Sequence, residues 1–301
     1  MRLYRYQTGS GPQLGIGAGE FVYHAATLFE RAGERAPDVV LQADMKSICA
    51  APDPVVVFLS EYLKQLSPPS QADGTAVLSL SKLKLLPPIP NPGKFICVGL
   101  NYQDHCDEQK KARPERPILF GKYCNAIVGD GDAVIKSTVT DKLDFEGELA
   151  VIIGSGGKRI PRGRALEHVF GYTIVNDISA RDVQRSDVQF LRAKSQDTFA
   201  PMGPCVVTAD EIADPQALAV RTTLNGQVMQ DSSTARMIFG VAELIEFISE
   251  GITLEPGDVI STGTPAGVGE HRNPPVLMQP GDVVEVDIGS IGRIRNTIVA
   301  G

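Results

Sequence analysis

The 301-residue sequence lacks several features by which protein classes are recognised. No apolar run approaches 18 residues, the length that a membrane-spanning helix needs, so we expect no transmembrane segment. The first residues lack the apolar core of a signal peptide. The five cysteines are an odd number without a Cys-x-x-Cys pair, which is typical of free thiols in a reducing compartment. These absences together predict a cytoplasmic protein.

The sequence also lacks an excess of positive charge. It has 29 Lys and Arg residues against 36 Asp and Glu residues, a formal net charge of −7 at pH 7. Nucleic acids and anionic membranes attract basic proteins, so we expect neither as a partner. A hydrophobic content of 43% is ordinary for a globular protein. The length suits one large domain or a domain with an appendage.

Common catalytic and nucleotide-binding motifs are absent as well. There is no His-Glu-x-x-His, no Gly-x-Ser-x-Gly and no Walker loop, so zinc peptidases, α/β-hydrolases and P-loop proteins have no support. Residues 15–19 read Gly-Ile-Gly-Ala-Gly, but the last glycine of Gly-x-Gly-x-x-Gly would fall on Glu20. No helix is expected there, and a turn is the better interpretation.

The segments that are present are mostly short strands between turns. Two amphipathic helices are expected, at 55–66 and, as the longest, at 237–248. A proline-rich passage at 87–92 excludes helix and central strand and is the best domain boundary. The predicted strands are residues 3–6, 21–24, 94–99, 149–153, 170–176, 205–208, 218–224, 259–262 and 283–288.

The first indication of chemistry lies at the start of the strand 149–153. Alternation in a strand puts Phe145 and Leu149 on one side, with Asp144, Glu146 and Glu148 on the other. The two glutamates would lie about 7 Å apart. Hard divalent cations take carboxylate oxygens at roughly 2.0–2.6 Å, so the pair is a candidate metal site. A solvated strand face is the alternative, and the apolar strand that follows favours the metal without deciding it.

Two further segments carry candidate polar groups. Asp177 follows the strand 170–176, where a carboxylate can complete a metal site, and Ser179 can cap the next helix.

Asn101 is expected to cap a short helix that places His105 and Glu108 on one face. A surface position for the histidine is the alternative. Residues 109–116 are charged and have little to bury, so residues 102–116 are expected to be weakly anchored and to act as a lid.

These segments closely resemble the fumarylacetoacetate hydrolase superfamily, in particular its branch of acylpyruvate hydrolases and 2-hydroxyhepta-2,4-diene-1,7-dioate isomerases. The resemblance covers about residues 94–298 in family order. The matching motifs are Cys97-Val-Gly-Leu-Asn-Tyr-x-x-His-x-x-Glu108, Asp144-Phe-Glu-Gly-Glu-Leu-Ala-Val-Ile-Ile153, Asn176-Asp-Ile-Ser-Ala-Arg-Asp-x-Gln184, Lys194-Ser-x-Asp-Thr-Phe-Ala-Pro-Met-Gly-Pro204 and Ser261-Thr-Gly-Thr-Pro-Ala-Gly-Val-Gly269.

The resemblance implies a β-rich α+β fold. Residues 91–301 would form the mixed β-sandwich roll that is the family's catalytic domain, and residues 1–90 the small N-terminal α/β domain that some members carry. It also implies a homodimer.

The resemblance further implies roles for individual residues. Mg²⁺ or Mn²⁺ would be bound by Glu146, Glu148 and Asp177. The catalytic groups would be His105, Glu108 and Lys194, and the substrate-binding groups Arg181, Gln184, Lys122 and Thr264. For Arg181, an ion pair with the nearby acids is the alternative that the residues themselves leave open.

The implied reaction is hydrolysis of a C–C bond in an acylpyruvate-type β-diketo acid, through an enolate and a water activated by His105 and Glu108. Decarboxylation of an oxaloacetate-type acid and isomerisation of a 2-hydroxymuconate-type acid are alternatives at the same site. A metal-dependent binding protein without turnover is the alternative from another class.

The sequence departs from the family pattern in three places, one of which is Cys106-Asp107 beside His105 and Glu108. Gly147 stands between the glutamates where a bulkier apolar residue is common, and we expect it to loosen the strand. Residues 270–273 match no subfamily, which leaves the substrate open.

Overall fold

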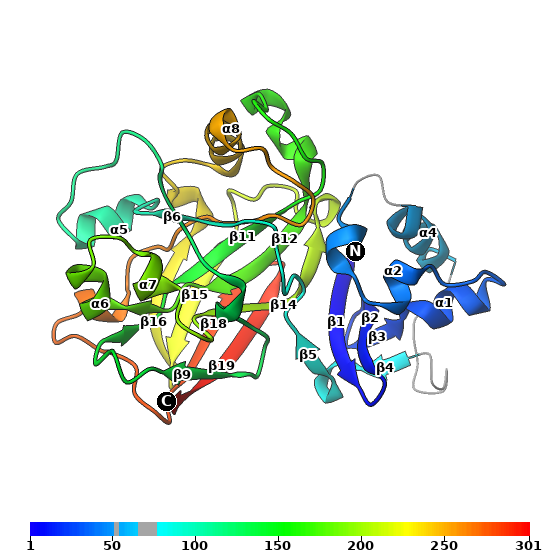
Figure 1. Ribbon diagram of the computed structural model, residues 1–301, viewed down its shortest axis with the longest axis horizontal. Helices are drawn as coiled ribbons and strands as arrows, with labels where there is room; N and C mark the ends of the chain where they lie inside the picture. The colour runs from blue at the N-terminus through cyan, green and yellow to red at the C-terminus, as the bar shows by residue number, and fades with distance from the viewer. Residues whose placement is uncertain (51–53, 66–76) are drawn as a thin grey trace.

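The centre of the protein is formed by strands that are buried along their whole length. The computed structural model describes residues 1–50, 54–65 and 77–301. Strands β11 (Gly147–Ile153) and β12 (Val169–Asn176) are buried at every position, as their near-continuous apolar sequences require. They pair antiparallel inside a 12-stranded sheet of order β4-β3-β2-β1-β14-β12-β11-β17-β6-β7, with β5 paired to β1 and β8 to β14 (Figure 1).

A second sheet of five strands, in the order β16-β15-β18-β19-β9, packs against this first sheet. Its strands β15 (Ala219–Leu224) and β18 (Val283–Ile288) alternate between buried and more exposed residues, because only one face covers the core. The bounds of its other strands are β16 (Gln227–Ser233), β19 (Gly292–Ala300) and β9 (Ala133–Lys136). The predicted β-rich α+β fold is confirmed.

Gly147 lies where the two sheets approach each other closely. A Cβ atom built on it would lie 2.4 Å from Thr222 Oγ1 and 2.8 Å from Val286 Cγ1, both of them buried side chains. Its N–H donates to Gln230 Oε1 (3.0 Å). The expectation that Gly147 loosens the strand is therefore wrong: the missing side chain is what lets β15 and β18 pack onto it.

The N-terminal part of the chain extends the large sheet instead of standing apart from it. Strand β1 (Arg2–Thr8) pairs with β14 (Ala200–Thr208), with Leu3 opposite Val206. Figure 1 shows the N-terminal helices gathered beside β1–β4. The bounds here are β2 (Gly11–Ala18), β3 (Phe21–His24), α1 (Ala25–Arg31), α2 (Asp38–Leu41), α3 (Met45–Ile48), α4 (Pro54–Leu63), β4 (Val77–Ser79) and β5 (Lys84–Leu86).

The two predicted amphipathic helices are present with different bounds. Helix α4 ends at Leu63, and the predicted end at residue 66 lies outside the described residues. Helix α8 (Val241–Gly251) begins after Gly240, four residues later than predicted, because Thr234–Arg236 forms a separate 3₁₀ turn. Within the described residues, no helix combines the length and apolarity needed to cross a bilayer.

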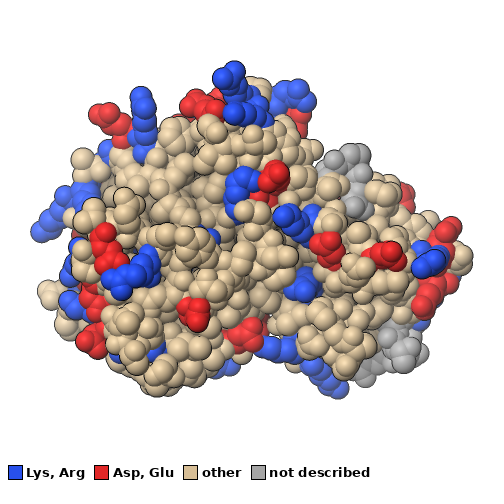
Figure 2. Space-filling view, viewed as in Figure 1, with Lys and Arg blue, Asp and Glu red and all other residues tan. Residues whose placement is uncertain are grey.

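The remaining elements carry and surround the polar residues of interest. They are β6 (Phe95–Gly99), α5 (Gln103–Glu108), β7 (Ile118–Gly121), β8 (Ile127–Val128), β10 (Leu143–Asp144), β13 (Ser179–Ala180), α6 (Arg181–Ser186), α7 (Leu191–Lys194) and β17 (Val259–Ser261). On the face drawn in Figure 2, basic and acidic side chains of the described residues are interspersed and form no broad patch of one sign.

Candidate active site

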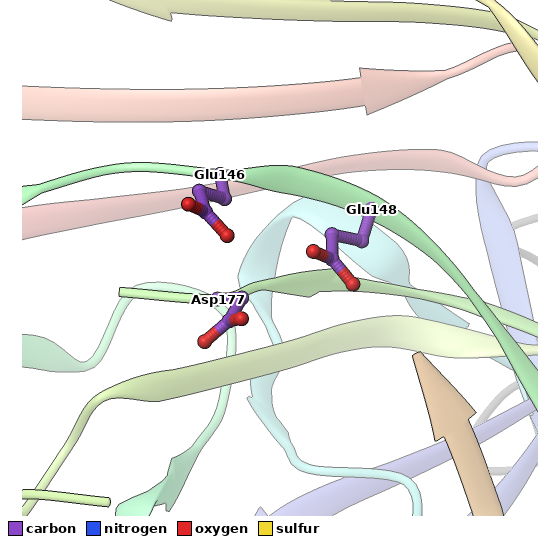
Figure 3. A group of neighbouring side chains, drawn as sticks. All are labelled: Glu146, Glu148 and Asp177. Atoms are coloured by element: carbon purple, nitrogen blue, oxygen red, sulfur yellow. The ribbon is translucent and has the colours of Figure 1, made fainter. Parts of the chain in front are cut away.

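Three buried carboxylates meet where β11 and β12 pair. Glu146 precedes β11, Glu148 lies within it, and Asp177 follows β12. The backbone brings them together, because the N–H of Asp177 donates to the carbonyl of Glu146 (2.8 Å). One carboxylate oxygen of each residue lies within 4.8 Å of the others. Figure 3 shows the three side chains around a common space.

The electrostatics of this triad are those of a cation site. Ser261 Oγ (2.5 Å) and the N–H of Gly263 (3.0 Å) donate to one oxygen of Glu148. Burial, followed by the charges of Asp177 and Glu146, raises the pKa of Glu148 well above its usual value. Three converging hard oxygen donors fit Mg²⁺ or Mn²⁺, because a divalent cation would relieve their mutual repulsion.

Two lysines lie against the triad. Lys194 Nζ lies 2.7 Å from Glu146 Oε2 and 2.8 Å from Asp177 Oδ2. Burial alone would lower the pKa of Lys194, but Asp177 and Glu146 outweigh it and the net pKa is raised. Lys122 Nζ lies 2.8 Å from Asp177 Oδ1 and donates to the carbonyl of Phe199 (2.8 Å).

Arg181 is held by acids on several sides. Its guanidinium lies 2.8 Å from Asp144 Oδ2, 2.6 Å from Glu146 Oε1 and 3.8 Å from Glu270 Oε2, and it also donates to Gln184 (3.2 Å). Burial alone would lower the pKa of Arg181, but the charges of Glu146 and Asp144 outweigh burial and the net pKa is raised. These contacts match the ion-pair alternative, since the charge is already compensated by protein carboxylates.

Asp144 does not share the face of the two glutamates as expected. The chain leaves the short β10–β13 pair at Asp144 before β11 begins, so the alternation of one continuous strand is broken. Asp144 instead accepts hydrogen bonds from the N–H of Gly269 (2.8 Å) and from Arg181 (2.9 Å).

His105 and Glu108 form the expected pair on α5, with 2.5 Å between His105 Nδ1 and Glu108 Oε1. The predicted cap is wrong, because the N-cap is Tyr102. Asn101 is buried, and its amide donates to the carbonyls of Phe239 (3.0 Å) and Thr262 (2.7 Å). A buried amide that satisfies distant backbone groups cannot also cap the helix.

The cap predicted at Ser179 is also wrong. Helix α6 has Ala180 as its N-cap, and Ser179 Oγ donates to the carbonyl of Asp177 (2.9 Å).

Helix α5 is more firmly anchored than the sequence predicts. The second oxygen of Glu108 accepts from the N–H of Gly267 (2.8 Å), and Asp104 accepts from Ser232 (2.6 Å). His105 and Cys106 are buried, whereas residues 110–116 are mostly exposed. The expectation of weak anchoring is therefore wrong for α5. Only residues 110–116, which are mostly exposed, agree with it.

A cavity of about 380 Å³ opens above the triad. Most of the predicted site residues line it, namely Glu146, Glu148, His105, Arg181, Gln184, Lys194 and Thr264. Lys122, Glu108 and Asp177 do not line the cavity. Thr264 Oγ1 donates to the carbonyl of Gly147 (3.0 Å), so it supports the backbone between the glutamates.

Sequence reasoning missed part of the lining. One wall is apolar and includes Val98, Phe120 and Phe190, and the other carries Gln109 and His271. Gln109 follows His105 by four residues, so helical spacing was a signal for it. Phe190 offered none, because it lies between two short helices that only the fold brings to the cavity.

A β-sandwich that buries a carboxylate triad beside a lysine and a His–Glu pair is the scaffold of an enzyme acting on small molecules. The sequence profile described as fumarylacetoacetate (FAA) hydrolase C-terminal matches residues 94–299. The chain therefore belongs to the fumarylacetoacetate hydrolase family, and it is an enzyme. Enzymes of this family generally depend on divalent metal ions, and the buried triad agrees with that dependence.

Relatives of this chain differ in the reactions for which they are named. An oxaloacetate tautomerase of Bacillus subtilis is 47% identical over 245 residues, 80% of each chain. The structure of a fumarylacetoacetate hydrolase from Exiguobacterium antarcticum is 36% identical and covers 100% of both chains, with a TM-score of 0.82. That of a 2-hydroxyhepta-2,4-diene-1,7-dioate isomerase from Mycobacterium marinum is 34% identical over 100% of this chain and 98% of the other, with a TM-score of 0.73.

Proposed function

We propose that the enzyme tautomerises the keto and enol forms of an oxaloacetate-type 2-oxo dicarboxylic acid, with Mg²⁺ or Mn²⁺ bound by Glu146, Glu148 and Asp177. The observation that carries the proposal is Lys194, a cavity-lining ammonium that contacts two of these three acids. The relative from Bacillus subtilis, 47% identical, supports the substrate class.

The protein's own groups have distinct tasks in this reaction. When bound, the divalent ion would act as a Lewis acid that polarises the 2-oxo group. In the direction from enol to keto, the ammonium of Lys194 would give a proton to the carbon beside the 2-oxo group, and the proton of the enol hydroxyl would return to the lysine. Its Nζ is kept in place by the acids and by the Phe120 ring 5.3 Å away. Arg181 is a positioning residue that fixes Glu146. Gln184 and Thr264 face the substrate from the cavity wall.

The test is the rate at which the enol absorbance of oxaloacetate decays. We expect acceleration with Mg²⁺ or Mn²⁺, loss of that acceleration with EDTA, and a loss of about 10²–10⁴-fold in Lys194→Met, the usual weight of a general acid–base group. Metal-independent decay at the buffer rate in the wild type would refute the proposal.

Hydrolysis of an acylpyruvate is a second candidate, favoured by two observations. His105 and Glu108 form a pair that can activate water, and the apolar wall with Phe120 and Phe190 suits an acyl chain. If this reaction operates, His105→Ala should keep its affinity for oxalate and its metal-dependent deuterium exchange at C3, while cleavage falls about 10²–10⁴-fold. Cleavage of acetylpyruvate at the wild-type rate by His105→Ala would exclude the water-activating role.

The remaining expectations concern assembly. A homodimer stays a prediction, and sedimentation of the purified chain measures it. A small-molecule substrate agrees with the enzymes to which the chain is related.

A further inference from the structure

Both ring nitrogens of His105 are occupied by neighbours from the next turn of the chain, Glu108 in α5 and Gln109 directly after it. Nδ1 lies 2.5 Å from Glu108 Oε1, and Nε2 lies 2.6 Å from the amide nitrogen of Gln109. Gln109 is half-buried and lines the cavity, one helical turn after His105. The nitrogen that a water-activating histidine must keep free is therefore covered by an amide.

The contacts define which nitrogen carries the proton. The carboxylate of Glu108 can only accept, so this contact places a proton on Nδ1. An amide nitrogen can only donate, which matches an unprotonated Nε2. The other oxygen of Glu108 is tied to the N–H of Gly267 (2.8 Å), so the carboxylate cannot turn to Nε2.

The Gln109 amide occupies the position beside Nε2 of His105 that an activated water would need. In hydrolysis a water lies at hydrogen-bond distance from Nε2, gives its proton to that nitrogen and bonds through oxygen to the substrate carbonyl. The C–C bond then breaks with its electron pair left on the enolate carbon. Proton transfer by Lys194 does not need this water, because Lys194 lies at the triad.

We propose that Gln109 determines the type of reaction: it caps Nε2 of His105 and keeps the attacking water out, so that the substrate is tautomerised and its C–C bond is not cleaved. Gln109 is a positioning residue in this scheme, acting through His105. The inference rests on the proposed function, since it explains how one site can tautomerise a substrate without hydrolysing it.

The contact is tested first by ¹⁵N NMR of the histidine side chains, which does not require turnover. The chain has 4 histidines, so His105 can be assigned with His105→Gln. We expect an unprotonated Nε2 shifted by its hydrogen bond in the wild type. The signal should move to the position of a nitrogen exposed to water in Gln109→Leu, and to that of a protonated one in Gln109→Glu. A protonated Nε2 in the wild type, or no change in Gln109→Leu, overturns the inference.

A matched control lies on the same helix. Gln103 is exposed, and its amide donates to Asp107 (2.8 Å), away from the cavity. Gln103→Leu makes the same chemical change without uncovering His105, and its His105 signals should equal those of the wild type.

The consequence is tested with acetylpyruvate, on which enol decay and cleavage can be followed in one reaction. We expect the ratio of cleavage to tautomerisation to rise about tenfold in Gln109→Leu, the upper range for one neutral hydrogen bond, and to stay unchanged in Gln103→Leu. An unchanged ratio in a Gln109→Leu protein with an uncovered Nε2 overturns the role of the cap. A wild type that turns over neither acetylpyruvate nor oxaloacetate refutes the proposed function instead, and the NMR result still decides the contact.

Discussion

At the scale of single residues, the site is built by side chains that serve two partners at once. Glu108 joins His105 to the loop at Gly267, and Arg181 joins Glu146 to the loop at Glu270. Such shared contacts are not additive, because removing one partner leaves a buried charge without compensation. Substitutions that preserve shape are therefore the most informative in this cavity.

Glu148→Gln separates metal binding from folding. The glutamine retains an acceptor for Ser261 and Gly263 and removes a charge that burial, Asp177 and Glu146 oppose. A carboxyl with a raised pKa costs stability above its unfolded pKa, so the metal-free variant should be at least as stable as the metal-free wild type at pH 7. It should lose turnover, and Mg²⁺ should no longer raise its Tm.

Calorimetric titration with Mg²⁺ and thermal unfolding measure both effects. Asp177→Asn should lose metal binding in the same way, and Glu250→Gln on the exposed side of α8 is the control. If Glu148→Gln is stabilised by Mg²⁺ as much as the wild type, the triad is not the metal site.

Gly147→Ala tests the close approach of the two sheets. The added Cβ would lie 2.4 Å from Thr222 Oγ1 and 2.8 Å from Val286 Cγ1, so either β11 or the second sheet must move. We expect a loss of about 1–3 kcal/mol in unfolding free energy, as for other overpacked cores, together with weaker metal binding because both neighbours are glutamates. Gly163→Ala, where a Cβ meets nothing within 4 Å, is the control. Equal urea midpoints for both variants would contradict the packing.

At the scale of elements, the sequence predicted strands well and helix starts poorly. The runs that became β11, β12 and β18 carry their own signal in apolar periodicity. The predicted helix caps at Asn101 and Ser179 were wrong because both side chains bond elsewhere. Asn101 donates to the distant carbonyl of Thr262, and Ser179 donates to the carbonyl of Asp177 two residues earlier. The prediction that Asp144 shares a face with Glu146 was wrong for a similar reason, because the pairing of β10 with β13 interrupts the strand between them.

The candidate site was predictable as a set of residue types but not as a set of contacts. The triad could be found because each acid adjoins an apolar strand. The sequence left an ion pair of Arg181 open, and helical spacing placed Gln109 near His105, but the atoms that make these contacts depend on side-chain geometry.

The start of α1 provides a pH-sensitive element. His24 is its N-cap, with Nδ1 accepting from the N–H of Thr27 (3.3 Å) and Nε2 bonded to Gln13 (3.0 Å). Burial lowers its pKa, partly offset by Glu30, so the folded state resists the proton that the unfolded chain takes up near pH 6.5. Stability from this group is full above that value and decreases as the pH falls toward the folded pKa.

His24→Asn should therefore flatten the acid side of the stability curve. Asparagine keeps a capping acceptor but does not titrate. Urea unfolding at pH 7.5 and 5.5 should show a smaller loss in the variant than in the wild type. A larger loss in the variant would mean that protonation of His24 stabilises the folded protein, which contradicts the prediction.

At the scale of the whole molecule, one sheet crosses the proposed boundary near residue 90. Strand β1 pairs with β14, and one buried cluster contains Leu3 and Phe29 together with Phe95 and Val206. A boundary can be predicted from prolines, but whether two parts unfold separately depends on the surface they share. The shared core favours a single cooperative unit.

Leu3→Ala tests whether the chain unfolds as a single unit, because Leu3 lies in the N-terminal part and the candidate catalytic residues do not. Leu3 is fully buried, so the substitution should cost about 2–5 kcal/mol. If the chain unfolds as one unit, the single calorimetric transition shifts down, and Mg²⁺-dependent stabilisation and activity are lost at the same lower temperature. Gln7→Ala, exposed on the same strand, should leave both unchanged. If the two parts were independent domains, unfolding would show two transitions. Leu3→Ala would then lower the temperature of the N-terminal transition only, and metal binding would persist after that transition.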